Sequence, residues 1–113
     1  MDGERARVKI EYQPANEYVA VRMRGNYMKN AGIIDGSLLI VHMQRYYDNG
    51  DIILFARAVN GKLQSFLRRV KMVGDAVLLI TEGDGELTTP EEGDFVIGVV
   101  VEVKTYIRKK YAA

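Results

Sequence analysis

The feature that most constrains the fold is a glycine-punctuated segment over residues 24–41, RGNYMKNAGIIDGSLLIV. Residues 18–23, just before it, alternate apolar and polar side chains, which is typical of a half-buried β-strand. Residues 38–41, at its end, form a continuous apolar run, which indicates a second strand. The backbone between the two strands is punctuated by Gly25, Gly32 and Gly36. The segment therefore predicts a tight reversal of the chain between β-strands.

Turn signals divide the rest of the chain into further short strands. Asn60-Gly61 is the best hairpin signal, because both residue types tolerate the positive φ of a type I′ turn, and it predicts that residues 62–70 pair with residues 52–59. The remaining elements that we expect are strands over 8–12, 77–80 and 95–106, one helical turn over 28–31, and loops over 42–49 and 82–93. No stretch has the pattern of a long amphipathic helix. The sequence predicts an all-β fold of short strands and hairpins.

Composition excludes several classes of protein. A chain of 113 residues with 48% hydrophobic side chains predicts a single globular domain over residues 1–113, in which residues 1–7 form a flexible leader. With no cysteine and one histidine, the chain can build neither a thiolate metal site nor a histidine cluster, and we expect no metal and no cofactor. No apolar run approaches the length of a signal or membrane segment, so we expect a cytoplasmic protein that does not contact membranes.

The glycine-punctuated segment resembles the active-site segment of the LexA/UmuD family of self-cleaving Ser/Lys peptidases. In that family Gly-Asp-Ser-Met is followed by Ala-Gly-Ile-x-Asp-Gly-Asp and an apolar strand. The matching residues are Gly25, Met28, Ala31, Gly32, Ile33, Asp35 and Gly36. Residues 49–53 and 98–103 also resemble family strands, so the resemblance covers residues 17–103. It implies a LexA/signal-peptidase-like fold of short coiled β-sheets.

The resemblance also implies that the catalytic dyad is lost. Tyr27 stands at the position of the family's nucleophilic serine. The activating lysine falls on Arg68 when counted back from the following turn, and on Phe66 when counted forward from Asn60-Gly61. An arginine keeps its proton at physiological pH and a phenylalanine has none to exchange, so neither can serve as the base. We expect the ring of Tyr27 to fill the former nucleophile pocket within reach of Arg68.

No other pair of residues predicts a replacement dyad. Ser37 stands just before the apolar strand, where we interpret it as a strand-entry residue. Ser65 lies in a strand in which Lys62, three residues away, points to the opposite face. His42 has no serine or carboxylate at a useful spacing, and we interpret it as a loop-edge residue.

Local patches predict no nucleic-acid or metal site. Sixteen basic residues against fifteen acidic ones leave a formal charge of +1, so no global field favours nucleic acid. No aromatic ladder interleaves the arginines of the basic clusters at residues 68–71 and 104–110, and we expect no direct nucleic-acid binding. Asp35 and Asp51 adjoin turn glycines, where aspartate caps backbone groups. Tyr46-Tyr47 either contacts a partner or covers the core, and we favour the second.

These observations predict a catalytically inactive LexA/UmuD-like domain that serves dimerisation and protein interaction, in an SOS-type DNA-damage response or in transcription regulation. We expect a homodimer and a protein partner such as a DNA polymerase or a repressor. Residues 99–106 are expected to form an exposed edge strand whose face for the second copy consists of Val99, Val101 and Val103. Two alternatives stay open: a peptidase that is self-cleaving or trans-cleaving through a displaced dyad, and a polymerase accessory protein of the processed UmuD type, which the short leader without a cleavable Ala-Gly or Cys-Gly bond resembles.

Overall fold

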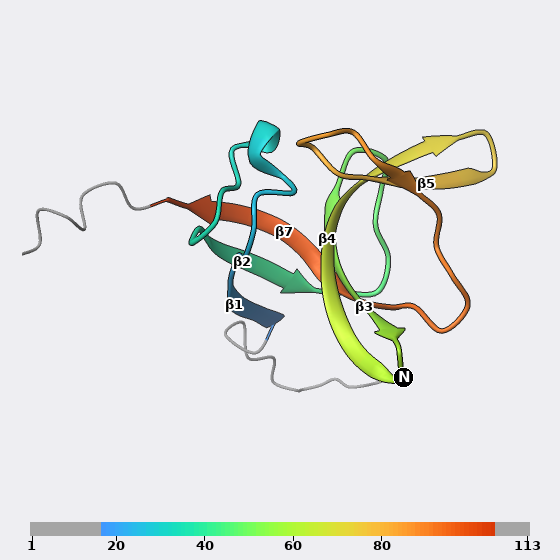
Figure 1. The fold of residues 1–113 in the computed structure, drawn as a ribbon, viewed down its shortest axis with the longest axis horizontal. Helices are drawn as coiled ribbons and strands as arrows, with labels where there is room; N and C mark the ends of the chain where they lie inside the picture. The colour runs from blue at the N-terminus through green and yellow to red at the C-terminus, as the bar shows by residue number, and fades with distance from the viewer. Residues whose placement is uncertain (1–16, 106–113) are drawn as a thin grey trace, which may run out of the picture.

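The computed structural model describes residues 17–105, which form one antiparallel sheet and a turn of 3₁₀ helix (Figure 1). The prediction of an all-β fold is confirmed. The strands follow one another across the sheet in the order β1-β2-β7-β3-β4-β5-β6. Along the chain the elements are β1 (Tyr18–Arg22), η2 (Lys29–Ala31), β2 (Leu38–Met43), β3 (Ile52–Val59), β4 (Lys62–Val73), β5 (Ala76–Ile80), β6 (Leu87–Thr88) and β7 (Phe95–Lys104).

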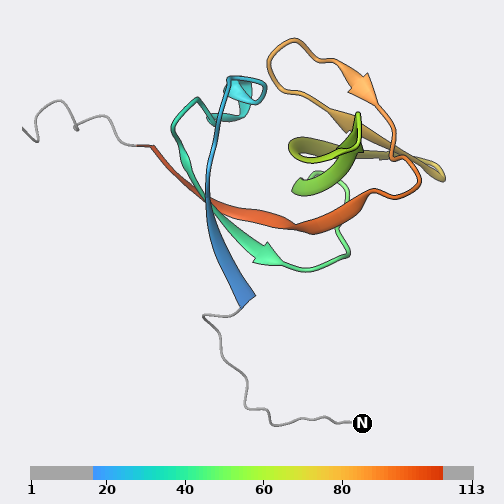
Figure 2. The ribbon, with the colours of Figure 1, turned by 60° about the horizontal axis from the view of Figure 1, so that its bottom comes forward.

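Strand β7 joins the two halves of the sheet. It pairs with β2 through residues 98–104 and with β3 through residues 95–99, and Figure 2 shows it running across the molecule between these halves. Gly98 lies where both neighbours meet β7, opposite Met43 on one side and Leu54 on the other. A Cβ atom on Gly98 would lie 2.2 Å from the carbonyl oxygen of His42. Only glycine therefore fits at this point of the sheet.

The coiled sheet buries two separate apolar clusters. Because side chains alternate along a strand, the neighbours Ile53 and Leu54 of β3 enter different clusters. The first cluster contains Met23, Met28, Ile33, Leu39, Val41, Leu54 and Leu67. The second contains Ile53, Phe55, Val70, Leu79 and Val99. The first cluster takes residues from β2, β3 and β4 and so spans both halves of the sheet, whereas the second takes its residues from β3, β4, β5 and β7.

The predicted hairpin at Asn60-Gly61 is confirmed. Asn60 has φ 52° and Gly61 has φ 79°, the two positive values that a type I′ turn needs. The register from Val59 opposite Lys62 to Ile52 opposite Arg69 follows from this turn. The helical turn that was predicted over residues 28–31 is also present, as η2.

Three predictions about element bounds need correction or lie outside the described residues. Strand β2 continues to Met43, so His42 lies on a strand rather than in a loop. The predicted loop over residues 82–93 contains the short strand β6, which pairs with β5. The strand expected over residues 8–12 and the chain beyond residue 105 lie outside the part that the structure describes.

The expectation of an exposed edge over residues 99–106 is met in part, by residues 100–104, whereas the expectation that Val99, Val101 and Val103 share one face is wrong. The strand lies inside the sheet, and only residues 100–104 lack a partner strand on the β3 side within residues 17–105. Val99 is buried in the second cluster, whereas Val103 packs against the first. A register shift opposite Ile40 and Val41 leaves Val101 at a bulge, and this extra residue breaks the alternation of faces. Of the three valines, only Val101 is exposed.

Replacing Gly98 tests the close approach of β2 and β7. Gly98→Ala should lower the free energy of unfolding by about 3 kcal/mol or more, because the new methyl group meets backbone atoms that cannot move independently. Gly61→Ala is the matched control: its Cβ meets nothing within 4 Å, and only the positive φ of 79° opposes it, at a cost of about 1 kcal/mol. Urea denaturation measures both variants. Equal losses would contradict the steric role of Gly98.

Candidate functional site

A cleft of about 360 Å³ lies between the end of β1 and the middle of β4. This volume falls within the range of roughly 300–1,000 Å³ that is usual for ligand pockets. Its apolar lining includes Leu39, Leu54 and Leu67. The residues at the predicted dyad positions, Tyr27, Phe66 and Arg68, all line it. The structure thus brings together side chains that are some forty residues apart in the sequence.

One long edge of this cleft is a stretch of β4 that has a partner strand on one side only. Strand β4 pairs with β3 through residues 62–69, but with β5 only through residues 69–73. Residues 62–68 therefore have no second neighbour strand within the described part of the chain, and residues 64–68 line the cleft. Backbone N–H and C=O groups on such an edge are available to an added strand.

The glycine-punctuated segment forms the opposing wall, and its motif residues hold that wall in shape. The Gly25 N–H donates to Asp35 Oδ1 (2.7 Å), and the Asp35 N–H donates to Asn26 Oδ1 (2.9 Å). Met28 and Ile33 form a β-bridge and are both completely buried. The two ends of the loop are therefore tied at the surface by hydrogen bonds and in the core by apolar contact.

The remaining motif glycines adopt conformations that other residues resist. Gly32, with φ 84°, ends the 3₁₀ turn and donates to the carbonyl of Lys29. Gly36, with φ 90°, donates its N–H to the carbonyl of Met23 (2.8 Å). Both positive φ values favour glycine because a Cβ atom is crowded there. The motif residues thus have a structural role that does not depend on catalysis.

The loop after β5 holds the backbone of Tyr27 through hydrogen bonds. The Glu82 N–H donates to the Tyr27 carbonyl (2.9 Å), and the Asn30 N–H donates to the Glu82 carbonyl (2.6 Å). The Glu82 carboxylate in turn accepts two hydrogen bonds from Arg69, of 2.8 and 3.1 Å, which lower the pKa of Glu82 below its usual value. The backbone of Tyr27, at the predicted serine position, is therefore held by Glu82, which is itself held by Arg69.

The ring of Tyr27 lies at the rim of the cleft. A Cβ atom on Gly25 would lie 2.8 Å from Tyr27 Cε2, so the ring packs over the bare backbone of this glycine. The Cζ atom of Arg68 lies 5.9 Å from the ring centroid, within the range of a cation–π contact. Tyr27 is nevertheless 59% exposed. The expected reach to Arg68 is confirmed, but the ring lines the rim of the cleft instead of filling it, so its replacement would remove little buried area.

Arg68 is half-buried and makes little use of its donors. Its Nη1 donates to the carbonyl of Leu67 (2.7 Å), and its Cζ lies 5.5 Å from the centroid of the Phe66 ring. Burial lowers the pKa of Arg68, while Glu86 and Tyr27 partly offset this effect. No carboxylate of residues 17–105 forms an ion pair with it. Its charge is therefore poorly compensated within the described structure.

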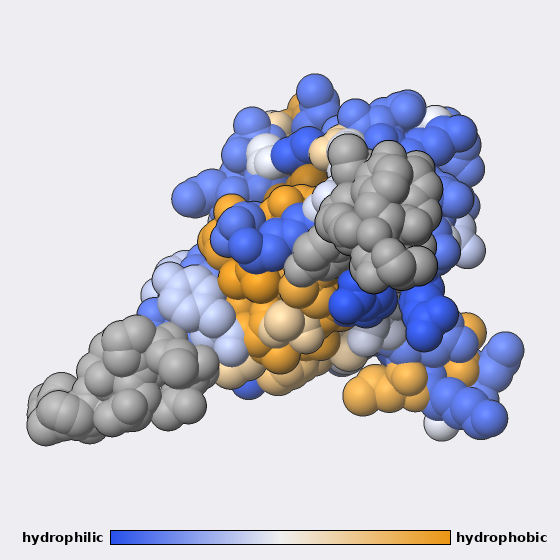
Figure 3. Space-filling model, turned by 90° about the vertical axis from the view of Figure 1, so that its left-hand side faces the viewer, coloured by the Kyte–Doolittle hydropathy of each residue, from blue (hydrophilic) through white to orange (hydrophobic). Residues whose placement is uncertain are grey.

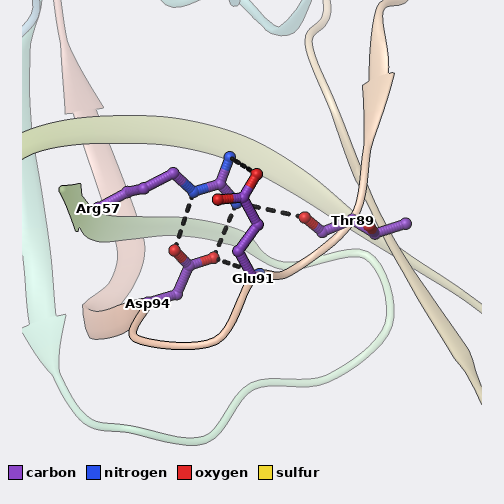
Figure 4. A network of polar contacts seen from close by, with 4 residues as sticks. All are labelled: Arg57, Thr89, Glu91 and Asp94. Carbon is purple, nitrogen blue, oxygen red and sulfur yellow. Dashed lines mark hydrogen bonds and ion pairs between the residues drawn. The ribbon is translucent and has the colours of Figure 1, made fainter. Parts of the chain in front are cut away.

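The charge of Arg57, in contrast, is balanced by nearby carboxylates (Figure 4). It donates from Nε and Nη2 to the two carboxylate oxygens of Asp94, both at 2.8 Å, and from Nη2 to the Thr89 carbonyl at 3.2 Å. Glu91 adds an ion pair at 3.4 Å. The hydrogen bonds with Asp94 raise the pKa of Arg57 and lower the pKa of Asp94. Arg57 and Arg68 together line a smaller cleft of about 140 Å³ beside the first.

The other nucleophile and base candidates do not form a dyad. Ser65 is exposed and lines the cleft, whereas Ser37 is buried and its Oγ accepts the Ile34 N–H (3.1 Å). His42 lies outside the cleft and contacts Gln44 and Glu17, whose hydrogen bonds raise its pKa. Among the described residues that line the cleft, none is a lysine or a histidine.

Within residues 17–105 no group of three or more acidic, histidine or cysteine side chains could hold a metal ion. Asp35 and Asp51 instead accept hydrogen bonds from backbone N–H groups. In the same part of the chain, no helix has the length and apolar character that crossing a bilayer requires. Of the two loop tyrosines, Tyr47 packs against the second apolar cluster and Tyr46 is exposed.

Sequence reasoning missed the open edge of β4, and a signal for it was present. Strand β4 has twelve residues, but its neighbour β5 has only five, so β5 cannot cover its whole length. The sequence already predicted a longer strand over residues 62–70 than over residues 77–80. What could not be foreseen is that the uncovered stretch faces the end of β1.

Comparison with known proteins gives a consistent family match. The family model described as Peptidase S24-like matches residues 3–101. The LexA repressor of Marinobacter nauticus is 33% identical over 96 residues, which cover 81% of this chain and 45% of the repressor. The LexA repressors of Colwellia psychrerythraea (36% over 73 residues) and Ectopseudomonas mendocina (39% over 71 residues) each match over 32% of their length. The chain spans less than half the length of each of these relatives.

The ion pair between Arg57 and Asp94 should make the stability of the fold decrease at acid pH. Asp94→Asn should lower the free energy of unfolding at pH 7 by about 1.5–3 kcal/mol, because it removes the charge from two hydrogen bonds of a largely buried pair. Since Arg57 lowers the folded-state pKa of Asp94, the contribution is complete above the unfolded pKa of about 3.9 and is lost as the pH falls through the lower folded pKa. Urea denaturation of both proteins between pH 7 and pH 2 measures this loss.

Glu91→Gln is the matched control, because Glu91 contacts the same guanidinium group with a side chain that is 60% exposed. It should change stability by less than about 0.5 kcal/mol. A difference between the wild type and Asp94→Asn that stays constant down to pH 2 would show that the ion pair does not carry the effect.

Proposed function

The chain belongs to the Peptidase S24-like family, and we propose that it is a member that does not cut peptide bonds but serves as a dimerisation and protein-interaction domain. The observation that carries this proposal is the lining of the cleft. The cleft is present, yet Tyr27 stands at the serine position, and Arg68 and Phe66 stand at the two possible lysine positions.

The chemistry of these side chains supports an inactive site. A Ser/Lys dyad needs a lysine that gives up its proton, so that it can take a proton from the serine hydroxyl. Burial lowers the pKa of Arg68, but the pKa of an arginine starts so far above neutral that the side chain stays protonated at neutral pH. The phenol of Tyr27 is bulkier than a serine hydroxyl.

The relatives suggest the biological setting. The matched proteins are LexA repressors, and we place this domain in transcription regulation or an SOS-type DNA-damage response in the cytoplasm. A repressor or a DNA polymerase would be the protein partner. An accessory protein of the processed UmuD type is a specific form of the same proposal, in which the polymerase is the partner.

A second candidate function is a peptidase with a displaced dyad. It is favoured by one observation, the exposed hydroxyl of Ser65 at the cleft. Lys62 does not line the cleft, and no other lysine or histidine of the described residues does. The displaced dyad would therefore need a base from elsewhere, which makes it the weaker proposal.

Dimerisation is supported by an open edge and an apolar surface on the same strands. Residues 100–104 pair with β2 but have no described strand on their other side. The surface over the β1-β2-β7 half of the sheet is rich in apolar side chains (Figure 3). The exposed apolar side chains of these strands include Val19 (36%), Met43 (46%) and Val101 (55%). A second copy that pairs through this edge would cover Val101.

Labelling with a serine-reactive fluorophosphonate tests the inactive site. The wild type should remain unlabelled and should not cleave itself at alkaline pH, as followed by mass spectrometry. Tyr27→Ser alone should also remain unlabelled, because Arg68 cannot act as the base. Tyr27→Ser combined with Arg68→Lys should gain labelling. Labelling of the wild type that disappears in Ser65→Ala would overturn the proposal in favour of the displaced dyad.

Sedimentation tests the dimer. At tens of micromolar the wild type should sediment at twice the 12.7 kDa mass of the chain, and Val101→Asp should shift it toward the monomer, because a buried unpaired charge opposes association. Leu63→Asp is the matched control, since Leu63 is 76% exposed on β4, away from residues 100–104. A wild-type monomer, or equal behaviour of both variants, would contradict this interface.

A further inference from the structure

We propose that the cleft binds an extended segment of a partner protein in which an aspartate or glutamate is flanked by apolar residues, and that Arg68 binds the acidic side chain. This inference rests on the proposed function, because it treats the cleft as a binding site that does not cleave its ligand. It adds the chemical class of the ligand and the residue that selects it.

The first argument is the state of Arg68. Its guanidinium lies near the rings of both Tyr27 and Phe66, with Cζ at 5.9 and 5.5 Å from their centroids. A single hydrogen bond, to the neighbouring carbonyl of Leu67, occupies it within the described structure. Arg57 and Arg69, in contrast, each form two hydrogen bonds with one carboxylate. An arginine held by its neighbours with donors left over is well suited to a planar carboxylate.

The second argument is the charge of the cleft. Its lining includes three arginines, Arg22, Arg24 and Arg68, and no aspartate or glutamate among the described residues. Glu86 and Asp84 act on the pKa of Arg68 through space but form no ion pair with it. Removing a carboxylate from water is compensated when it meets several donors of opposite charge. The cleft is therefore complementary to an acidic group rather than to a basic or neutral one.

The third argument is the open edge of β4. Residues 64–68 offer unpaired backbone groups along the cleft, so an extended segment could add to the sheet there. Side chains of an added strand alternate in direction, and those that point inward would meet Leu39, Leu54 and Leu67. This geometry selects apolar residues on one face. Arg68, at the end of the open stretch, selects the acidic residue.

Fluorescence anisotropy with two matched pools of short peptides tests the inference. Both pools carry mixed Ala, Val and Leu around one fixed position, which is Glu in the first pool and Gln in the second, and both are capped at each end so that Glu provides the sole carboxylate. The full chain should bind the Glu pool at least about tenfold more tightly than the Gln pool, because charge-assisted hydrogen bonds are about twice as strong as neutral ones. Added salt should reduce this preference.

Arg68→Gln should abolish the preference for Glu. Lys71→Gln is the matched control, because it removes one positive charge from an exposed position of the same strand outside the cleft. Thermal melting of both variants shows whether they remain folded. A Glu preference that survives Arg68→Gln, or that Lys71→Gln removes equally, overturns the assignment to Arg68. If the wild type binds neither pool, the docking site is overturned. This holds also if a second copy or residues of the chain itself occupy the cleft.

Mass spectrometry of the same peptide mixtures separates this inference from the proposed function. Cleaved peptides would refute the non-cleaving function, whereas intact peptides that do not bind would refute the docking site and leave the non-cleaving function standing. A third pool, with Gln at the fixed position and a free carboxyl terminus, tests the other source of a carboxylate. Tight binding of this pool alone would overturn the assignment of an internal acidic residue.

Discussion

The structure depends on the close approach of β2 and β7 at Gly98. At this point β7 is hydrogen-bonded on both sides, and the carbonyl oxygen of His42 lies where a Cβ atom would otherwise be. Every strand of the β1-β2 half connects to the β3-β4-β5-β6 half through β7. Because both halves contribute residues to the first apolar cluster, the contact at Gly98 also positions the two walls of the cleft relative to each other.

The motif residues that shape the cleft are different from the residues at the predicted dyad positions. The hydrogen bonds between Gly25, Asn26 and Asp35 and the bridge between Met28 and Ile33 shape one wall of the cleft. None of these contacts needs a serine at position 27. The shape of this wall therefore does not depend on which side chain stands at position 27.

Three arginines illustrate how tertiary structure gives different roles to one residue type. Arg57 forms two hydrogen bonds with the carboxylate of Asp94, and Arg69 forms two with that of Glu82. These bonds attach the loops that carry Asp94 and Glu82 to the sheet. Arg68, beside Arg69 in the sequence, points to the cleft and lacks such a partner among the described residues. The basic run at residues 68–71 is thus divided between two sides of a strand, which argues against a continuous basic surface.

Sequence reasoning was most successful where structure is local. The type I′ turn at Asn60-Gly61 requires only the φ preferences of two residues, and it sets the whole register between β3 and β4. The glycine-punctuated motif identified the family and assigned Tyr27 to the serine position, and counting from turns assigned Phe66 or Arg68 to the lysine position; all three residues line one cleft. These successes rest on backbone preferences and on spacing, both of which are written directly in the order of residues.

What the sequence by itself determined is therefore the strand content, the main hairpin and the family. Tertiary structure alone decided the position of β7 inside the sheet, the separation of Val99, Val101 and Val103, the exposure of Tyr27 and the open edge of β4. Strand order depends on pairing between distant segments, and a single-residue bulge reverses the faces beyond it. Exposure, likewise, depends on which distant side chains pack against a residue, and no local pattern encodes that.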